Sequence, residues 1–292
     1  MMGPQTKPGS ESKMTQCGEE ADPQVRASLL GVAFAYPDGG GALEGIDLEV
    51  RTGGRLALVG PNGAGKTTVL RLLAGQIAPS RGTVRIENLN PATADRRELA
   101  KRVAVVSAQA LVGFPYSVEE VVLMGRAPHV DGFRLESGRD LEVAEQSMAA
   151  MDVSQLAHRV FDSLSSGEKQ RVAVARALAQ EPKVLLLDEP GAFLDIRHQV
   201  DLYDLLSERA KTEGLTVISV LHDLNLAALY FDTVAMVAGG TIYAQGAADD
   251  VITYANVRAV FETDVYVDRN DLTGKLNVLP LPASVLRKQD AN

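Results

Sequence analysis

The stretch that most constrains the fold is LALVGPNGAGKTTVLRLLAG, residues 56–75, in which a short apolar run enters a glycine-rich loop that opens into helical sequence. Residues 60–67 match the pattern G-x-x-x-x-G-K-[ST] in full. In such a loop the glycines let backbone N–H groups converge on phosphate oxygens, the lysine neutralises the β- and γ-phosphates, and the hydroxyl reaches Mg²⁺. A chance glycine turn is the weaker alternative, because the loop lies between a predicted strand and a predicted helix. The sequence therefore predicts a nucleotide phosphate site in an α/β protein.

Two further apolar runs predict strands of the same sheet. VLLLDEP (184–190) and LTVISVLHD (215–223) are short, wholly apolar at their start, and polar at their end. Continuous apolar strands suit a parallel sheet that is covered on both faces. A helix is predicted between them from apolar residues at helical spacing, which are Ile196, Val200, Tyr203 and Leu206.

Other segments predict antiparallel strands and a helical region. LLGVAFAYP (29–37) and the alternating ALEGIDLEV (42–50) indicate antiparallel strands. TVAMVAGGTIYAQG (233–246) predicts a hairpin with Gly239 and Gly240 at its turn. A helix is predicted over residues 138–160, with Leu141, Ala144, Met148 and Met151 on one face.

Acidic and imidazole groups follow the two later strands. An aspartate such as Asp188, at the carboxyl end of a buried strand, can hold Mg²⁺, and the adjacent Glu189 can orient or deprotonate an attacking water. A lone acidic pair is commonly a solvated strand end, but the glycine loop favours the functional interpretation. His222 alone would more often be structural, yet its place beside the phosphate-site strands makes it a candidate.

A second helix start has the features of an anion site. In FDSLSSGEKQRVAVARAL (161–178), Ser165 and Glu168 form the S-x-x-E pattern of a capping box. The N-terminus of a helix with small residues is also a place where a phosphate can bind. Because the glycine loop lies about a hundred residues earlier, the position of this helix start does not by itself say which phosphate it would bind.

These elements, in this order, resemble the ATP-binding cassette (ABC) family, because LSSGEKQR is similar to that family's LSGGQ-type motif and directly precedes the acid-terminated strand. The resemblance covers residues 28–270 approximately. It implies a P-loop NTPase ABC-ATPase core of α/β class, with an antiparallel β subdomain and an inserted α-helical subdomain. The domain boundaries expected are a disordered leader over residues 1–26, the ABC ATPase domain over 27–270 with its helical subdomain at about 110–165, and a C-terminal tail over 271–292.

The resemblance also assigns roles to individual residues. The adenine would stack on Tyr36, and the phosphates would be bound by Gly60, Pro61, Asn62, Gly63, Ala64, Gly65, Lys66, Thr67 and Thr68. The expected catalytic residues are Glu189, the switch histidine His222 and the Q-loop glutamine Gln109. Mg²⁺, bound together with ATP, would be held by Thr67, Gln109 and Asp188. The D-loop would be Leu194-Asp195.

In this family two cassettes pair head to tail, which implies that the second phosphate site acts in trans. The nucleotide held by the other copy would be contacted by Ser165, Ser166, Gly167 and Glu168. The chain has one set of motifs, so a homodimer with two ATP molecules at its interface is expected. Three positions depart from the family pattern: Ser166 replaces a glycine, Ser107-Ala108 replace Leu-Pro before the Q-loop glutamine, and Phe193 replaces a small or polar D-loop residue.

Within the family, three stretches resemble the ATPases of metal-chelate importers: GFPYSVEEVVLMGRAPH (113–129), LHDLNLAALYFD (221–232) and QGAADDVIT (245–253). This branch takes up ferric siderophores, haem or cobalamin. The resemblance implies two membrane permease subunits as partners, a solute-binding protein reached indirectly, and a peripheral location on the cytoplasmic face of the inner (plasma) membrane. Candidate permease contacts are Arg126, Pro128 and His129, for which a structural role is an equal alternative.

Other classes are disfavoured by composition and spacing. A net charge of −9 argues against a nucleic-acid binder. ABC ATPases that act on DNA or ribosomes generally carry long coiled-coil insertions or two tandem cassettes. In this sequence the interval of 122 residues from Lys66 to Asp188 leaves room only for a compact subdomain. A regulatory module without turnover would not need Glu189 and His222. An exporter ATPase stays as an alternative. The single cysteine, Cys17, excludes an intrachain disulfide and fits a reducing compartment.

Overall fold

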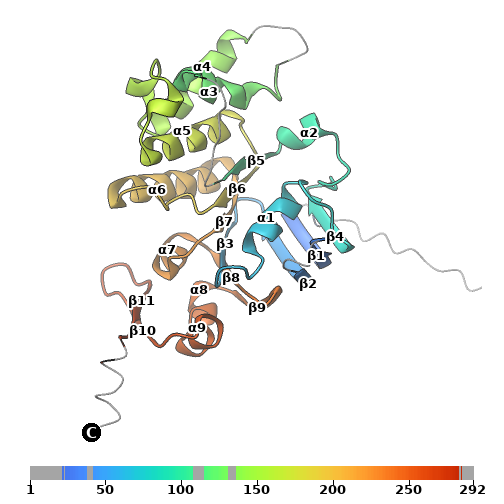
Figure 1. Ribbon diagram of the computed structural model, residues 1–292, viewed down its shortest axis with the longest axis vertical. Helices are drawn as coiled ribbons and strands as arrows, with labels where there is room; N and C mark the ends of the chain where they lie inside the picture. The colour runs from blue at the N-terminus through green and yellow to red at the C-terminus, as the bar shows by residue number, and fades with distance from the viewer. Residues whose placement is uncertain are drawn as a thin grey trace, which may run out of the picture.

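The computed structural model describes residues 24–37, 42–107, 115–130 and 136–282, together with Asp22 and Ser284. Within these residues a six-stranded sheet has the order β5-β6-β7-β3-β8-β9 (Figure 1). Its strands are β5 (Val103–Val106), β6 (Val184–Asp188), β7 (Thr216–Val220), β3 (Arg55–Val59), β8 (Thr233–Ala238) and β9 (Thr241–Gly246). The first five are parallel, and β9 pairs antiparallel with β8. The predicted strands and the predicted hairpin at residues 233–246 are confirmed.

Alternate residues of each parallel strand enter two separate hydrophobic cores. On β3, Ala57 and Val59 belong to one core, whereas Leu56 and Leu58 belong to the other. The first core includes residues of α5 (Ser166–Ala179), α6 (Ile196–Glu213) and α7 (Leu224–Tyr230). The second includes α1 (Lys66–Leu73) and the antiparallel strands described next. Because both faces are covered, these strands consist mainly of apolar residues, and this pattern is what predicted them from the sequence.

A three-stranded antiparallel sheet, in the order β2-β1-β4, covers the second face. Its strands are β1 (Val25–Ala35), β2 (Ala42–Arg51) and β4 (Arg81–Ile86). Strand β1 therefore starts inside the segment 1–26 that was expected to be a leader, and Arg26 forms an ion pair with Glu87. Residues 1–21 of that expected leader, Cys17 among them, lie outside the described residues.

A helical region lies at one end of the molecule (Figure 1). It contains α3 (Val118–Leu123), the 3₁₀ turns η1 (Met124–Arg126), η2 (Ser154–Leu156) and η3 (Phe161–Ser163), and α4 (Gly138–Ala150). The prediction of one helix over residues 138–160 is wrong in its extent, because α4 ends at Ala150 and Asp152 takes a left-handed conformation with φ of 51°. Leu141, predicted on the buried face, is 42% exposed, since that face runs through Val143, Ala144 and Met148.

The helix predicted between β6 and β7 is α6, but only part of its predicted apolar face is buried. Tyr203 and Leu206 lie in the core, whereas Ile196 is 81% exposed and Val200 is also exposed. Two smaller helices complete this part of the fold, α2 (Arg96–Ala100) before β5 and α8 (Ala248–Val251) after β9.

Towards the end of the described residues lie α9 (Tyr254–Phe261) and a two-stranded hairpin of β10 (Val265–Arg269) and β11 (Leu276–Pro280). Val265 and Val278 are buried in the first core. The hairpin crosses the expected boundary at residue 270, so β11 packs with the ATPase domain rather than with a separate tail. In the part of the chain that the structure describes, no helix combines the length and apolar character needed to cross a membrane.

Candidate functional site

The predicted phosphate loop, the acidic pair and the histidine lie at the same edge of the central sheet. Strand β7 lies between β6 and β3, and all three are parallel. The glycine loop follows β3, His222 follows β7, and Asp188 ends β6 and is followed by Glu189. The carboxyl edge of a parallel α/β sheet is where ligands bind in such folds.

The shape of the glycine loop depends on positions where a side chain cannot be placed. A Cβ on Gly60 would lie far inside contact distance of the Val237 carbonyl oxygen, and one on Gly65 would collide with the side chain of Leu43. Both glycines also have positive φ, 148° and 107°. Helix α1 begins at Lys66, and no described side chain caps its N-terminus. The first N–H groups of this helix are therefore available to an anion.

Lys66 is buried at the base of the loop. Its Nζ donates hydrogen bonds to the carbonyl oxygens of Gly60, at 2.7 Å, and Pro61, at 2.8 Å. An ammonium group carries three hydrogens, so one remains for a ligand. Burial lowers the pKa of Lys66, and the carboxylates of Glu189 and Asp188 oppose this shift. The pocket beside Lys66 has a volume of about 470 Å³.

Thr67, which lines this pocket, is hydrogen-bonded to Asp188, and both are predicted Mg²⁺ ligands. The Thr67 hydroxyl donates to the Asp188 carboxylate over 3.0 Å. Burial raises the pKa of Asp188, whereas the hydrogen bond from Thr67 acts against the rise. A hydroxyl and a partly buried carboxylate are hard oxygen ligands of the kind that Mg²⁺ prefers, and a cation would favour the ionised form of Asp188. The third predicted ligand, Gln109, lies outside the described residues.

Glu189 and His222 form a hydrogen-bonded pair at the mouth of the pocket. The His222 Nε2 donates to Glu189 Oε1 over 2.6 Å. Glu189 has a φ of 53°, which is uncommon for a residue with a side chain, and its N–H donates to the carbonyl of Val220 over 3.2 Å. Uncommon backbone conformations of this kind cluster at functional sites. The predicted general base therefore lines the same pocket as Lys66 and Thr67.

Tyr36 lies at the outer end of the pocket, beside α1. Its ring packs edge-to-face on Phe34 at 4.8 Å between centroids, and its hydroxyl is 3.4 Å from the Thr68 Oγ1. Arg71 donates to the Tyr36 hydroxyl over 3.0 Å. Arg71 also lines the pocket, and the sequence interpretation missed it. The signal was present, because Arg71 comes one helical turn after Thr67 and so faces the same side.

The second helix start has the capping box that the sequence predicts. Ser165 Oγ accepts from the Glu168 N–H over 3.3 Å, and the Glu168 carboxylate accepts from the Ser165 N–H over 2.8 Å. The Glu168 carboxylate accepts from both the Ser165 N–H and the Ser165 hydroxyl, and these two hydrogen bonds, led by the one from the backbone, lower the pKa of Glu168. Ser165 and Ser166 are exposed. Within the described part of the chain, neither they nor Gly167 and Glu168 line the pocket beside Lys66.

The predicted D-loop runs close to that helix start. Asp195 caps α6 by accepting from the His198 N–H over 2.9 Å, and its carboxylate also contacts the His198 Nδ1 at 2.8 Å. A Cβ added to Gly167 would lie 2.9 Å from the Phe193 carbonyl oxygen. The Phe193 side chain itself is exposed. The Phe193 carbonyl next to the predicted D-loop therefore lies in close contact with Gly167 at the start of the capped helix.

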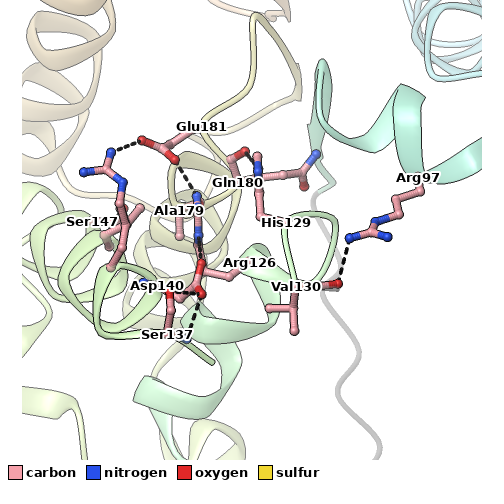
Figure 2. A network of polar contacts seen from close by, with 12 residues as sticks. Arg97, Arg126, His129, Val130, Ser137, Asp140, Ser147, Ala179, Gln180 and Glu181 are labelled. Atoms are coloured by element: carbon pink, nitrogen blue, oxygen red, sulfur yellow. Dashed lines mark hydrogen bonds and ion pairs between the residues drawn. The ribbon is translucent and has the colours of Figure 1, made fainter. Parts of the chain in front are cut away.

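The candidate permease contact Arg126 is internal instead. It is 4% exposed, and its guanidinium donates to Asp140 over 2.9 Å, to Glu181 over 2.7 Å and to the carbonyl of Ala179 over 2.7 Å (Figure 2). Hydrogen bonds from Ser137, and then from Arg126, lower the pKa of Asp140 to about 2.

The neighbouring candidates are also engaged within the chain. His129 Nε2 donates to the Gln180 carbonyl over 2.9 Å (Figure 2). The Pro128 carbonyl accepts from Arg97 over 2.8 Å. Of the two roles left open for these three residues, the structural one is what the contacts support. The network joins the end of α5 to the start of α4.

Comparison with known proteins gives a consistent result. Residues 43–192 match the family model described as ABC transporter. The hemin import ATP-binding protein of Streptomyces coelicolor is 45% identical over 238 residues, which cover 82% of this chain and 84% of that protein. The cobalamin import ATP-binding protein of Halobacterium salinarum is 41% identical over 240 residues, and the match spans 82% of this chain but only 60% of that protein.

Solved structures agree with the fold. A metal-chelate type ABC transporter in an inward-facing conformation matches with a TM-score of 0.78 at 27% identity, covering 89% of this chain and 99% of that one. An ATP-binding cassette solved as a dimer in a post-hydrolysis state, bound to ADP and Pi, matches with a TM-score of 0.68 at 27% identity, covering 76% of this chain and 98% of that one.

Proposed function

Because the chain belongs to the ABC transporter family, we propose that it is the ATP-hydrolysing subunit of an importer that moves a metal chelate through a separate membrane permease. The observation that carries this proposal is the convergence at one sheet edge of Lys66, the Thr67–Asp188 contact and the Glu189–His222 pair. A phosphate-binding lysine, a hard-oxygen cation site and a base next to a histidine are the groups that hydrolysis of a nucleoside triphosphate needs.

ATP is the proposed substrate of this pocket. The glycine-loop residues Gly60, Pro61, Asn62, Gly63, Ala64 and Gly65, with Thr68 at the start of α1, surround its phosphates. Tyr36 stacks on the adenine, and the free hydrogen of the Lys66 ammonium goes to the β- and γ-phosphates. Mg²⁺, when held by Thr67 and Asp188 with Gln109, supplies charge neutralisation of the phosphate oxygens.

Glu189 is the proposed general base or water-positioning group. The hydrogen bond from His222 orients the carboxylate. In the proposed mechanism the imidazole of His222 also contacts the γ-phosphate. A positioned base of this type contributes roughly 10²–10⁴-fold to a rate.

The active protein is proposed to be a homodimer. At the start of α5, Ser165 and Ser166 are exposed and Gly167 and Glu168 are partly exposed, and among the described residues none of the four lines its own chain's pocket. Paired head to tail, two copies would place each start of α5 and each Asp195 D-loop against the nucleotide of the other copy. The positive end of a helix dipole and its free N–H groups would then face the γ-phosphate. The cassette that was solved as a dimer with ADP and Pi supports this arrangement.

The transported substrate is proposed to be haem, a ferric siderophore or cobalamin. Relatives at 41–45% identity are named for hemin and cobalamin import, and a structural neighbour is of metal-chelate type. Two permease subunits would bind the surface near Gln109, and the solute-binding protein would act through them. We therefore propose a peripheral location on the cytoplasmic face of the inner (plasma) membrane, and we propose no nucleic acid as a partner.

Reconstitution with the permease tests the proposal. The chain is co-purified with its permease subunits, placed in liposomes with ATP, and assayed for uptake of haem, a ferric siderophore and cobalamin. Uptake of one chelate that stops when ATP is omitted supports the proposal. ATP hydrolysis with outward movement of substrate, or no association with a membrane protein, contradicts it.

A further inference from the structure

The C-terminal hairpin packs against the helix that follows His222. In the hairpin, Val267 faces Val278 across the two strands, and Val265 and Val278 are buried in the core beneath α7 and α9. The hairpin lies at the end of the molecule opposite α3 and α4, next to α7 (Figure 1). It therefore lies away from the helical region of α3 and α4 and contacts the helix that follows His222.

One side chain makes the connection. Asn225 Oδ1 accepts from the Val278 N–H over 2.7 Å, and Asn225 Nδ2 donates to the Val278 carbonyl over 3.3 Å. The amide thus binds both polar groups of one residue of β11, as a neighbouring strand would. The Asn225 N–H in turn donates to the Asp223 carboxylate over 2.7 Å. Since Asp223 directly follows His222, a chain of hydrogen bonds runs from β11 to the backbone beside the imidazole.

Packing fixes the later part of this helix more firmly than its start. Ala227 and Ala228 are buried, and Tyr230 near the end of α7 stacks on Tyr203 at 5.2 Å between ring centroids. Leu224 and Leu226 are only partly buried against the core, so the hydrogen bonds of Asn225 add to the contacts that hold the start of the helix beside His222. The His222 side chain is 47% exposed. The direction of its ring is therefore set by the backbone at the start of α7 and by its bond to Glu189.

We propose that Asn225 is a positioning residue, through which the C-terminal hairpin β10–β11 holds His222 in line with Glu189 for ATP hydrolysis. The inference deepens the proposed function and rests on it. It predicts that loss of the Asn225 amide lowers the rate of the chemical step, because His222 moves, and leaves ATP binding to the glycine loop unchanged.

Asn225→Ala tests this, with Asn256→Ala as a matched control. Asn256 is also a partly buried helical asparagine whose Nδ2 donates to a backbone carbonyl, that of Val251 over 2.9 Å, but it lies on α9. Small displacements of catalytic groups cost up to about 10²-fold. We expect kcat for ATP to fall about tenfold in Asn225→Ala, with KM within about twofold of wild type, and to stay within about twofold in Asn256→Ala.

A second variant tests the proposal if Asn225→Ala unfolds. Asn225→Asp retains the acceptor for the Val278 N–H, the shorter of the two bonds, and should keep more of kcat than Asn225→Ala. The side-chain NMR signal of His222 distinguishes a positioning role from a general structural role, which would leave this signal unchanged. The sequence has four histidines, so each imidazole can be followed separately. Asn225→Ala should shift the His222 signal and leave those of His129, His158 and His198 in place.

The outcomes separate the two proposals. A wild-type protein that neither binds nor hydrolyses ATP overturns the proposed function. Active wild-type protein combined with an unchanged kcat in Asn225→Ala, or an unchanged His222 signal, overturns only the positioning role. A rise in KM with unchanged kcat does so as well, since it would place the effect on nucleotide binding.

Discussion

The Glu189 carboxylate accepts a hydrogen bond of 2.6 Å from the His222 imidazole, although 33 residues separate them in the chain. Their strands, β6 and β7, are neighbours, and Asp188 pairs in register with Val220. The hydrogen bond thus follows from the order of the strands in the sheet. It joins the proposed general base to the residue that is proposed to contact the γ-phosphate.

Substitution of Glu189 by glutamine should separate binding from turnover. Glutamine keeps the size of the side chain and loses its capacity to accept a proton, so ATP hydrolysis should fall roughly 10²–10⁴-fold while ATP still binds. The variant should accumulate as a closed dimer in the presence of ATP, measured by size-exclusion chromatography with light scattering. Full turnover by Glu189→Gln would show that another group is the base.

Lys66→Ala should weaken nucleotide binding. A charge-assisted hydrogen bond contributes about 1.5–3 kcal/mol, so the Kd for ATP should rise roughly 10–150-fold by titration calorimetry. Lys211→Ala is the matched control, because Lys211 is exposed on α6 and does not line the pocket. An unchanged Kd in Lys66→Ala would remove Lys66 from the phosphate site.

Ser165→Arg should abolish hydrolysis without weakening ATP binding by the monomer, because the bulk and charge are placed at the nucleotide of the other copy. ATP binding is measured by calorimetry, and hydrolysis by phosphate release. Ser154→Arg, at an exposed serine of η2, is the control and should hydrolyse ATP at the wild-type rate. An active Ser165→Arg protein would rule out a site shared between two chains.

Asp140→Asn should lower stability and alter its pH dependence. The ordinary pKa of 3.8 falls to about 2 in the folded protein, so ionised Asp140 stabilises the fold above pH 3.8, and this contribution is lost as pH falls through about 2. The variant leaves Arg126 with fewer partners and should lose about 1–3 kcal/mol of unfolding free energy at pH 7. Its stability should then fall less than that of wild type between pH 4 and 2.

Urea unfolding at several pH values measures both effects. Glu142→Gln is the control for Asp140→Asn, since Glu142 is an exposed acidic residue on the same helix. An equal loss of unfolding free energy in the two variants at pH 7 would contradict the role of the Arg126–Asp140 pair.

The sequence predicted the elements whose local pattern has a single physical explanation. The glycine loop at residues 60–67 and the apolar runs of β3, β6 and β7 are examples, because phosphate binding and burial on both faces each restrict the residue types allowed. The capping box at Ser165 was predictable for the same reason, since both its bonds are made within four consecutive residues.

Features that depend on distant partners were not predictable. For Arg126 the sequence left a permease contact and a structural role as equal alternatives. Its burial depends on Asp140 and Glu181, which lie 14 and 55 residues away. The end of α4 and the place of β11 in the domain likewise depend on tertiary packing. Arg71 was missed because an arginine in a helix is usually solvated. The roles of Gln109 and of the helix start in trans stay predictions.

The collision that Gly60 avoids has a consequence for engineering. The carbonyl that excludes a side chain there belongs to Val237 on β8, which pairs with β3. The conformation of the phosphate loop is thus restricted by contact with a strand almost 180 residues downstream. A chimera that transplants the loop and α1 into another scaffold would need β8 as well, because the transplanted peptide lacks the strand that packs against Gly60.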